Sequence, residues 1–125
     1  KVGDLTPTRD FNYVKDTCRG FLAIAKAENV AGEEINIATD TEISMQDTLN
    51  LIAEIMGADV NWVKDPERCR PSKSEVFRLH GSNEKICRLT DWRPQYSIRE
   101  GLKQTIEWFT NPENLKKYKS NIYNR

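Results

Sequence analysis

Residues 9–16 read RDFNYVKD, and this stretch decides which fold and which kind of site we expect. It places an arginine beside carboxylates at the mouth of a predicted helix, an arrangement suited to holding a phosphate and a sugar. Elsewhere the sequence contains neither a glycine-rich cofactor loop nor a Tyr-x-x-x-Lys motif. The stretch therefore predicts a ligand-binding unit, and the absence of these two motifs predicts that the unit has no catalytic part of its own.

The overall composition predicts one small globular domain. A chain of 125 residues is expected to form a single domain with a modest core. Its formal net charge is zero, and acidic and basic residues are mixed along it. A protein that binds nucleic acid usually presents a basic face, so this composition argues against a nucleic-acid partner. No apolar run approaches membrane-spanning length, so we expect no membrane partner.

The cysteines favour a reducing compartment. Cys18, Cys69 and Cys87 are odd in number and form no C-x-x-C pair, which argues against a disulfide framework or a zinc site. A single histidine, His80, cannot complete a metal cluster with cysteines so widely spaced. We therefore expect a cytoplasmic protein without a metal ion.

The first half of the chain combines helical and strand-like patterns. A helix is expected over about residues 17–27, with Asp16 as its N-cap. The apolar stripe of this helix is formed by Phe21, Leu22 and Ala25. Residues 34–38 alternate polar and apolar side chains and predict a short strand.

Two further helices carry clear terminal signals. Ser44 with Asp47 is a near match to a capping box, apolar residues follow at helical spacing, and Gly57 predicts the end of the helix. Ser97 with Glu100 forms a second capping box. The apolar face of the helix after it consists of Ile98, Leu102, Ile106 and Phe109.

Shorter elements complete the expected architecture. We expect strands at residues 60–63 and 75–79, a loop at residues 65–74, and a short helix from Ser82 to about Leu89. Short strands with several helices indicate an α/β fold, in the form of an α+β-like small domain. The strands are too few for a full doubly wound sheet, and the glycines never fall in a G-x-G-x-x-G pattern.

Several motifs, in the correct order, resemble those of the extended short-chain dehydrogenase/reductases, the nucleotide-sugar epimerases and 4,6-dehydratases. RDFNYVKD is similar to their R-D-aromatic-x-Tyr/His-V-x-D segment. The other similar segments are residues 34–38 (their Y-N-I-G strand), 43–45, 70–71 (R-P), 92–94 (G-W-x-P) and 101–108 (G-L-x-x-T-I-x-W). Ala38 and Asp91 stand where the family usually has glycine, which puts the local turn geometry in question.

The resemblance implies that substrate binding and catalysis belong to different domains. Residues 1–125 would be a nucleotide-sugar-binding C-terminal domain, and the catalytic NAD(P)-binding domain with its Rossmann half would be absent. NAD(P) is implied for the complete enzyme, but we expect this chain to bind no cofactor and to be inactive alone. The implied partner is a nucleotide-diphosphate sugar.

The resemblance also implies the site residues. Arg9 and Arg70 would bind the diphosphate, because a guanidinium donates two parallel charge-assisted hydrogen bonds. The alternative for Arg9 is an ion pair with Asp10 or Asp16 that orders the loop.

Two further residues are expected at the site. Glu75 would accept hydrogen bonds from the ribose hydroxyls; its alternative is a solvated glutamate on an edge strand. Asn36 would contact the ligand or brace the adjacent loop, and bracing is the commoner fate of a buried amide.

A second hypothesis comes from a different functional class. The chain would then be a non-catalytic, stand-alone module that mediates interactions or self-association, derived from the same family. A domain that lacks a neighbouring lobe exposes an apolar patch, and such patches promote association. A homo-oligomer is therefore possible under this hypothesis.

Overall fold

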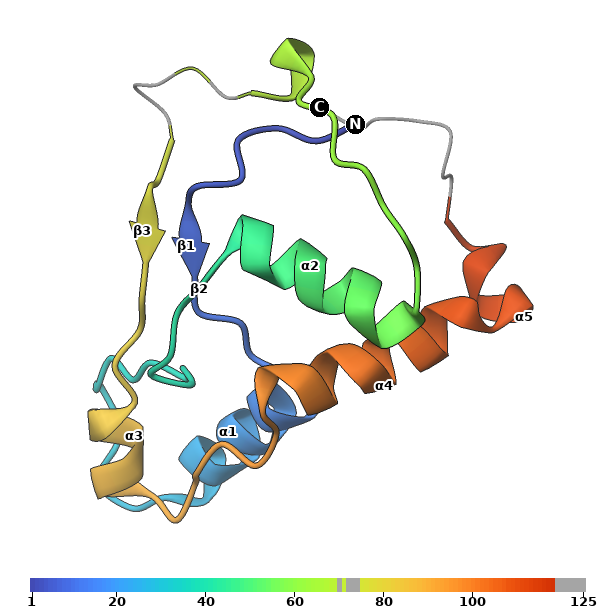
Figure 1. Ribbon diagram of the computed structural model, residues 1–125. Helices are drawn as coiled ribbons and strands as arrows, with labels where there is room; N and C mark the ends of the chain where they lie inside the picture. Colours follow the sequence, from blue (N-terminus) through green and yellow to red (C-terminus); the bar gives the residue numbers. More distant parts are fainter. Residues whose placement is uncertain (70, 72–74, 119–125) are drawn as a thin grey trace.

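The computed structural model describes residues 1–69, 71 and 75–118 (Figure 1). Arg70, one of the expected site residues, lies outside the described residues. The elements are β1 (Thr8–Arg9), α1 (Val14–Lys26), β2 (Ile43–Ser44), α2 (Met45–Met56), the 3-10 helix η1 (Pro66–Arg68), β3 (Arg78–Leu79), α3 (Glu84–Leu89), α4 (Ile98–Thr110) and α5 (Pro112–Leu115).

The described strands form one small mixed sheet in the order β2-β1-β3. β1 runs antiparallel to β2 and parallel to β3, and Thr8 is paired with Ser44 on one side and Arg78 on the other. Figure 1 shows α2 beside this sheet, α1 and α3 at the bottom of the view, and α4 running from beside α1, below α2, toward α5. The small α/β fold class expected from the sequence is confirmed.

Two expected strands are absent from the described sheet, and both expectations were wrong for the same reason. Residues 34–38 alternate as a strand should, yet they pair with no described strand. From residues 60–63, the Val63 carbonyl accepts a hydrogen bond from the Val2 amide at 2.9 Å, but no strand forms. An alternating pattern predicts a half-buried extended segment, but a strand also needs a neighbour to complete its hydrogen-bond ladder.

Smaller differences concern the ends of the expected elements. Thr8 and Arg9 form β1, and the expected strand at residues 75–79 is reduced to the two residues of β3. A 3-10 helix occupies part of the expected loop at residues 65–74.

The capping signals were read correctly. The Ser44 side chain accepts a hydrogen bond from the Asp47 amide at 2.9 Å, and Gly57 ends α2 in the left-handed conformation with φ of 62°. Ser97 and Glu100 form the reciprocal capping box at the start of α4. Local hydrogen bonds of this kind depend on neighbours in sequence, which is why the pattern alone finds them.

The N-cap predicted for α1 was wrong. The helix begins at Val14, so Asp16 lies inside the first turn, where it is completely buried. Its carboxylate accepts hydrogen bonds from the Gln95 amide at 3.0 Å and the Tyr96 amide at 3.1 Å, and it forms an ion pair with Arg19. Asp16 thus joins α1 to the connection between α3 and α4, eighty positions away in sequence.

A tryptophan strengthens the same junction. Trp92 is only 2% exposed, and its indole Nε1 donates a hydrogen bond to the Asp16 carbonyl at 3.0 Å. The other buried apolar residues of the described chain are Ala38 and Ile86, so the apolar core is small.

The apolar stripe expected to face the core from α1 lies on the surface instead. Phe21 is 65% exposed and Leu22 is 60% exposed. The helix buries its other face, where Gly20 lies so close to Ile37 that a Cβ at position 20 would come within 2.7 Å of that side chain.

The described residues contain no helix long and apolar enough to cross a bilayer. Across the same residues, no three His, Cys, Asp or Glu side chains gather as a candidate metal site.

We predict that Asp16→Asn destabilises the fold by about 3 kcal/mol, because the amide cannot match two backbone donors and leaves the Arg19 charge without its partner. Urea denaturation measures the change in unfolding free energy. Asp91→Asn, at an exposed aspartate on the same connection, is the matched control and should cost about 0.5 kcal/mol or less. Equal losses in the two variants would contradict a special role for Asp16.

Ala38 stands where the sequence resemblance implies a glycine, and its methyl group lies against Gly81. Gly81 packs against it so closely that a Cβ at position 81 would lie 2.6 Å from the Ala38 Cβ. We predict that Gly81→Ala destabilises the fold by about 2 kcal/mol through overpacking, and that adding Ala38→Gly recovers at least half of that loss. Thermal denaturation of the two single variants and the double variant tests this; additive losses would refute the coupling.

Candidate functional site

Among the expected site residues that the structure describes, Arg9 has the most hydrogen bonds to the sheet and its neighbours. It ends β1, and the parallel pairing with β3 brings residues 75–79 alongside it. Its Nη1 donates hydrogen bonds to the Thr8 carbonyl at 2.8 Å and the Val76 carbonyl at 2.7 Å. Its Nη2 donates to Glu75 Oε1 at 3.3 Å. Two residues that the family resemblance assigns to the site are therefore in direct contact.

The guanidinium keeps part of its donor capacity. Nη1 donates twice and Nη2 once, which leaves the Nε hydrogen and one Nη2 hydrogen of the five without an acceptor among the described residues. The Arg9 side chain is 21% exposed, so solvent and ligands can reach it. The described residues thus hold the guanidinium in one orientation and leave two of its N–H groups without an acceptor among them.

Asp10 is directed away from Arg9 and has a separate structural role. Its carboxylate accepts hydrogen bonds from the Thr39 amide and the Asp40 amide, each at 3.1 Å, and from the Thr39 hydroxyl. This arrangement follows from the alternation of side chains along an extended segment. The alternative in which Arg9 pairs with Asp10 or Asp16 is not what the structure shows, because the partner of Arg9 is Glu75.

Glu75 is more enclosed than the sequence suggested. Its side chain is 12% exposed and bonded to Arg9, so it is not the solvated glutamate of the alternative interpretation. One carboxylate oxygen, Oε2, has no hydrogen-bond partner among the described residues. That oxygen is the acceptor that a hydroxyl-bearing ligand would meet beside Arg9.

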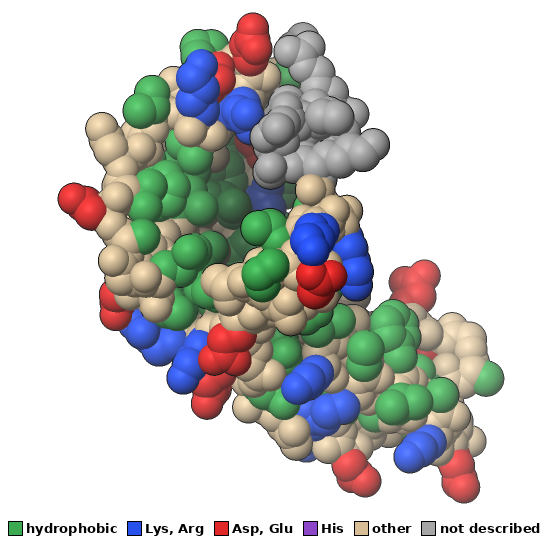
Figure 2. Space-filling model, turned by 90° about the vertical axis from the view of Figure 1, so that its right-hand side faces the viewer, with side chains coloured by type: hydrophobic (Ala, Val, Ile, Leu, Met, Phe, Trp, Pro, Cys, Tyr) green, Lys and Arg blue, Asp and Glu red, His purple; other side chains and the backbone are tan. Residues whose placement is uncertain are grey.

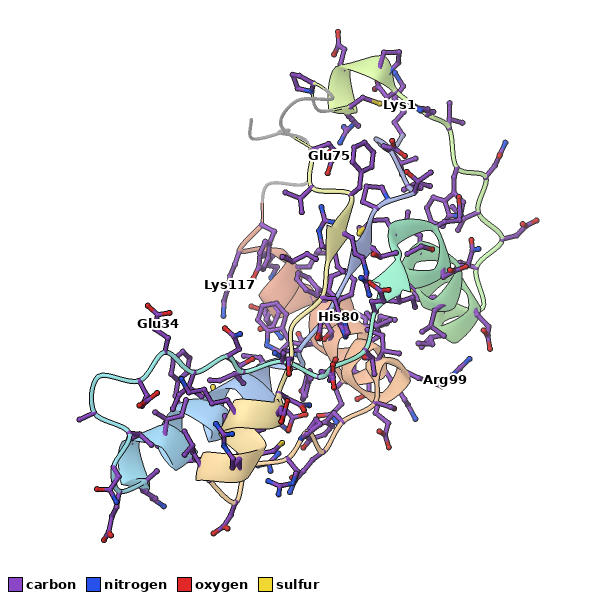
Figure 3. The ribbon with its side chains drawn as sticks, turned by 90° about the vertical axis from the view of Figure 1, so that its left-hand side faces the viewer. Lys1, Glu34, Glu75, His80, Arg99 and Lys117 are labelled. Carbon is purple, nitrogen blue, oxygen red and sulfur yellow. The ribbon has the colours of Figure 1, made fainter. Side chains whose placement is uncertain are left out.

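Asn36 is not brought together with this pair. It is exposed, and its side chain forms no hydrogen bond with any described residue. Figure 3 shows Glu34, two residues earlier, well away from Glu75. The loop is instead braced by Asn12, whose Nδ2 donates to the Ile37 carbonyl while its Oδ1 is buried without a partner in the described structure.

Sequence reasoning missed a second cation on the same sheet. Arg78 on β3 donates from Nε to both carboxylate oxygens of Glu42, at 2.8 and 3.1 Å, and the Thr8 hydroxyl donates to Glu42 as well, at 3.2 Å. The Arg78 hydrogen bond is the main cause that lowers the pKa of Glu42 below its ordinary value. No local signal reveals this pair, because it exists only once Thr8 is in register with Arg78.

Comparison with known proteins shows which family this chain belongs to. The family model described as GDP-mannose 4,6 dehydratase matches residues 1–105. An epimerase from Methanothermobacter thermautotrophicus superimposes with a TM-score of 0.81 at 34% identity, over 93% of this chain and 34% of that one. UDP-glucose 4-epimerase from Thermotoga maritima, solved with UDP-glucose, gives 0.76 at 31% identity, over 87% and 33%.

A third solved structure is RMD from Pseudomonas aeruginosa, complexed with NADPH. Its TM-score is 0.75 at 26% identity, over 85% of this chain and 33% of that one. The chain spans about a third of the length of the curated relatives and solved proteins that it matches.

We predict that Arg78→Ala raises the pKa of Glu42 back toward its ordinary value of 4.5. A carboxyl whose folded-state pKa is lowered adds stability above its ordinary pKa and loses it as the pH falls through the lowered pKa. The wild type should therefore lose this contribution as the pH falls below about 4.5, and the variant should lack the part that Arg78 supplies. Carbon-detected NMR titration of the Glu42 carboxyl measures the shift; Arg99→Ala is the control that should leave the titration unchanged.

Proposed function

Since this chain belongs to the family of NAD-dependent epimerases and dehydratases, we propose that residues 1–125 are its nucleotide-sugar-binding C-terminal domain, which grips the substrate but does not turn it over alone. The observation that carries the proposal is the Arg9 guanidinium, which is fixed by two carbonyls and Glu75 while two of its N–H groups have no acceptor among the described residues. Side chains held in one geometry before binding cost less ordering entropy when a ligand arrives.

The diphosphate is the part of the ligand that Arg9 suits best. A guanidinium donates charge-assisted hydrogen bonds to phosphate oxygens and stays protonated at any physiological pH. We assign Arg9 to one phosphate, and we assign Arg70 to the diphosphate on the family motif alone, because Arg70 lies outside the described residues. The neighbouring carboxylate of Glu75 partly neutralises Arg9, which limits its attraction for simple anions.

The nucleoside end of the ligand would meet Glu75. With Oε1 engaged by Arg9, the remaining oxygen can accept from a ribose hydroxyl, which couples recognition of the sugar to the orientation of the arginine. Asn36 belongs to the site only if the ligand extends to its exposed loop, and we assign it a ligand contact on the family motif alone.

The described residues do not fit an NAD(P) site. Dinucleotide binding in this family class uses a parallel sheet with a glycine-rich turn at a helix N-terminus. The sheet here has three strands of two residues each, and the sequence has no such turn. We therefore place the NAD(P) of the complete enzyme, and the chemical step, outside these residues.

A second candidate function is self-association as a non-catalytic module. The exposure of large apolar side chains such as Phe21, at 65%, favours it. Light scattering with and without a nucleotide sugar separates the two proposals: an oligomer that forms regardless of ligand supports self-association.

We predict that Arg9→Ala lowers the affinity for UDP-glucose at least tenfold, because a charge-assisted hydrogen bond is worth about 1.5–3 kcal/mol. Isothermal titration calorimetry with UDP-glucose, GDP-mannose and dTDP-glucose measures the loss. Arg99→Ala removes an exposed arginine on α4 and should leave binding unchanged. Equal affinities for wild type and Arg9→Ala would reject the assignment.

We predict a different signature for Glu75→Ala. The wild type should prefer UDP over 2′-deoxy-UDP, and the variant should lose most of that preference, because its acceptor for the ribose hydroxyl is gone. The same calorimeter gives both affinities. A preference that survives in Glu75→Ala would leave Glu75 as a partner of Arg9 only.

A further inference from the structure

A basic hollow lies between α1 and α3, and none of the described residues of the proposed nucleotide-sugar site lines it. Its volume is about 640 Å³. The charged side chains around it are Arg19 and Lys26 from α1, Arg88 from α3, and Asp91 and Arg93 from the segment after α3. Figures 1 and 3 both show α3 beside α1, and Figure 3 shows Glu75 far from them. Four cations thus surround one cavity together with a single carboxylate.

The overall charge of the chain does not account for this concentration of cations. The formal net charge is zero, and on the face seen in Figure 2 basic and acidic side chains are interspersed. At the hollow, Asp16 neutralises Arg19 through their ion pair, and Asp91 is the acidic residue of the lining. When these two carboxylates are counted against the four cations, two positive charges remain in excess.

Two of the four cations are held in place by the backbone around them. Nη1 of Arg93 donates hydrogen bonds to the Trp92 carbonyl at 2.6 Å and the Thr90 carbonyl at 3.3 Å. Arg19 pairs with Asp16 and donates from Nη2 to the Arg93 carbonyl at 3.2 Å. Groups that are fixed before a ligand arrives lose less entropy when they bind it.

The other two cations have no partner of this kind. The side chains of Lys26 and Arg88 are exposed, and they form no hydrogen bond or ion pair with any residue that the structure describes. Glu33 is the carboxylate that Arg88 influences, but Glu33 already pairs with Lys85 at 2.7 Å. The hydrogen bond from Lys85 is the main cause that lowers the pKa of Glu33, and Arg88 contributes less. Lys26 and Arg88 are therefore positive charges that a small anion can reach.

A simpler role for these two residues is to offset the helix dipoles. Lys26 lies in the last turn of α1 and Arg88 in the last turn of α3, where basic side chains are favourable. That role explains each cation by itself. It does not explain why cations from two helices and from the following segment line the same hollow.

We infer that this hollow binds a phosphate dianion, either as free phosphate or as the phosphate group of a monoester. The two positive charges in excess match the charge of about −2 that such a group carries near neutral pH. Guanidinium groups donate paired hydrogen bonds to phosphate oxygens, and a lysine adds a point charge. Part of the wall is apolar, formed by Leu22, Ala23, Ala27 and Leu89, and could contact the organic part of a monoester.

This inference does not rest on the proposed nucleotide-sugar site. It concerns other residues, and it holds or fails whether or not Arg9 binds a diphosphate.

Two-dimensional ¹H–¹⁵N NMR of the whole chain tests the inference, with inorganic phosphate and glucose 1-phosphate as the two probes. The ionic strength is kept at about 0.15 M, where distant exposed charges are largely screened. We expect a Kd of about 1 mM or tighter, with the largest changes at the amides of Ala27, Leu89 and Thr90. The amide of Val76, whose carbonyl bonds to Arg9, reports on the nucleotide-sugar site separately.

The two probes distinguish the two sources of the phosphate group. Tighter binding of glucose 1-phosphate assigns the hollow to a monoester, whose organic part meets the apolar wall. Equal or tighter binding of inorganic phosphate assigns it to the free ion.

A pair of double variants makes the test specific. Lys26→Ala with Arg88→Ala removes the two unpartnered cations and should weaken binding at least about tenfold. Arg99→Ala with Lys103→Ala is the matched control, because it removes the same residue types from exposed positions on α4. The control should leave the affinity unchanged. Circular dichroism checks that both variants keep the fold, as expected for exposed side chains.

Three results would overturn the inference. The first is the absence of changes at Ala27, Leu89 and Thr90 with about 10 mM of either probe. The second is an equal loss of affinity in the two double variants, which would indicate a general attraction of anions to positive charge. The third is a set of changes confined to the surroundings of Val76, which would leave the nucleotide-sugar site as the place where phosphate binds.

Discussion

The buried carboxylate of Asp16 is the constraint on which the rest of the structure depends. It is completely buried in the first turn of α1 and accepts hydrogen bonds from two consecutive backbone amides, those of Gln95 and Tyr96. A buried charge is tolerated only when such donors satisfy it, so the loop must close on α1 for the domain to fold. The closure also sets the start of α4, because the capping residue Ser97 follows Tyr96 directly.

Residues 9–16, which contain Asp16, also supply the candidate site, because side chains alternate in direction along their extended part. Arg9 and Asp10 are adjacent in an extended segment, so their side chains leave on opposite sides. Arg9 meets Glu75 and the Val76 carbonyl, while Asp10 secures the turn at Thr39 and Asp40. One side of the stretch thus serves the proposed ligand and the other serves the fold. Asp10 anchors the 38–40 turn, and the sheet holds Arg9 in position.

The small core explains why so much apolar surface remains outside. Among the large aliphatic and aromatic side chains that the structure describes, only Ile86 and Trp92 are buried, with exposures of 0% and 2%. Strands of two residues contribute little pairing energy, and the junction at Asp16 relies on polar contacts rather than on volume.

The sequence by itself determined the local and the compositional properties of this protein. It predicted the caps at Ser44, Gly57 and Ser97, the small α/β class and the family, because these follow from neighbouring residues and ordered motifs. Only the tertiary structure decided the pairing of Arg9 with Glu75, the burial of Asp16 and the exposure of Phe21. Sequence periodicity shows that a face is apolar or that a segment is extended. It does not show which partner that face or edge meets, because the partner lies far away in the chain or outside it.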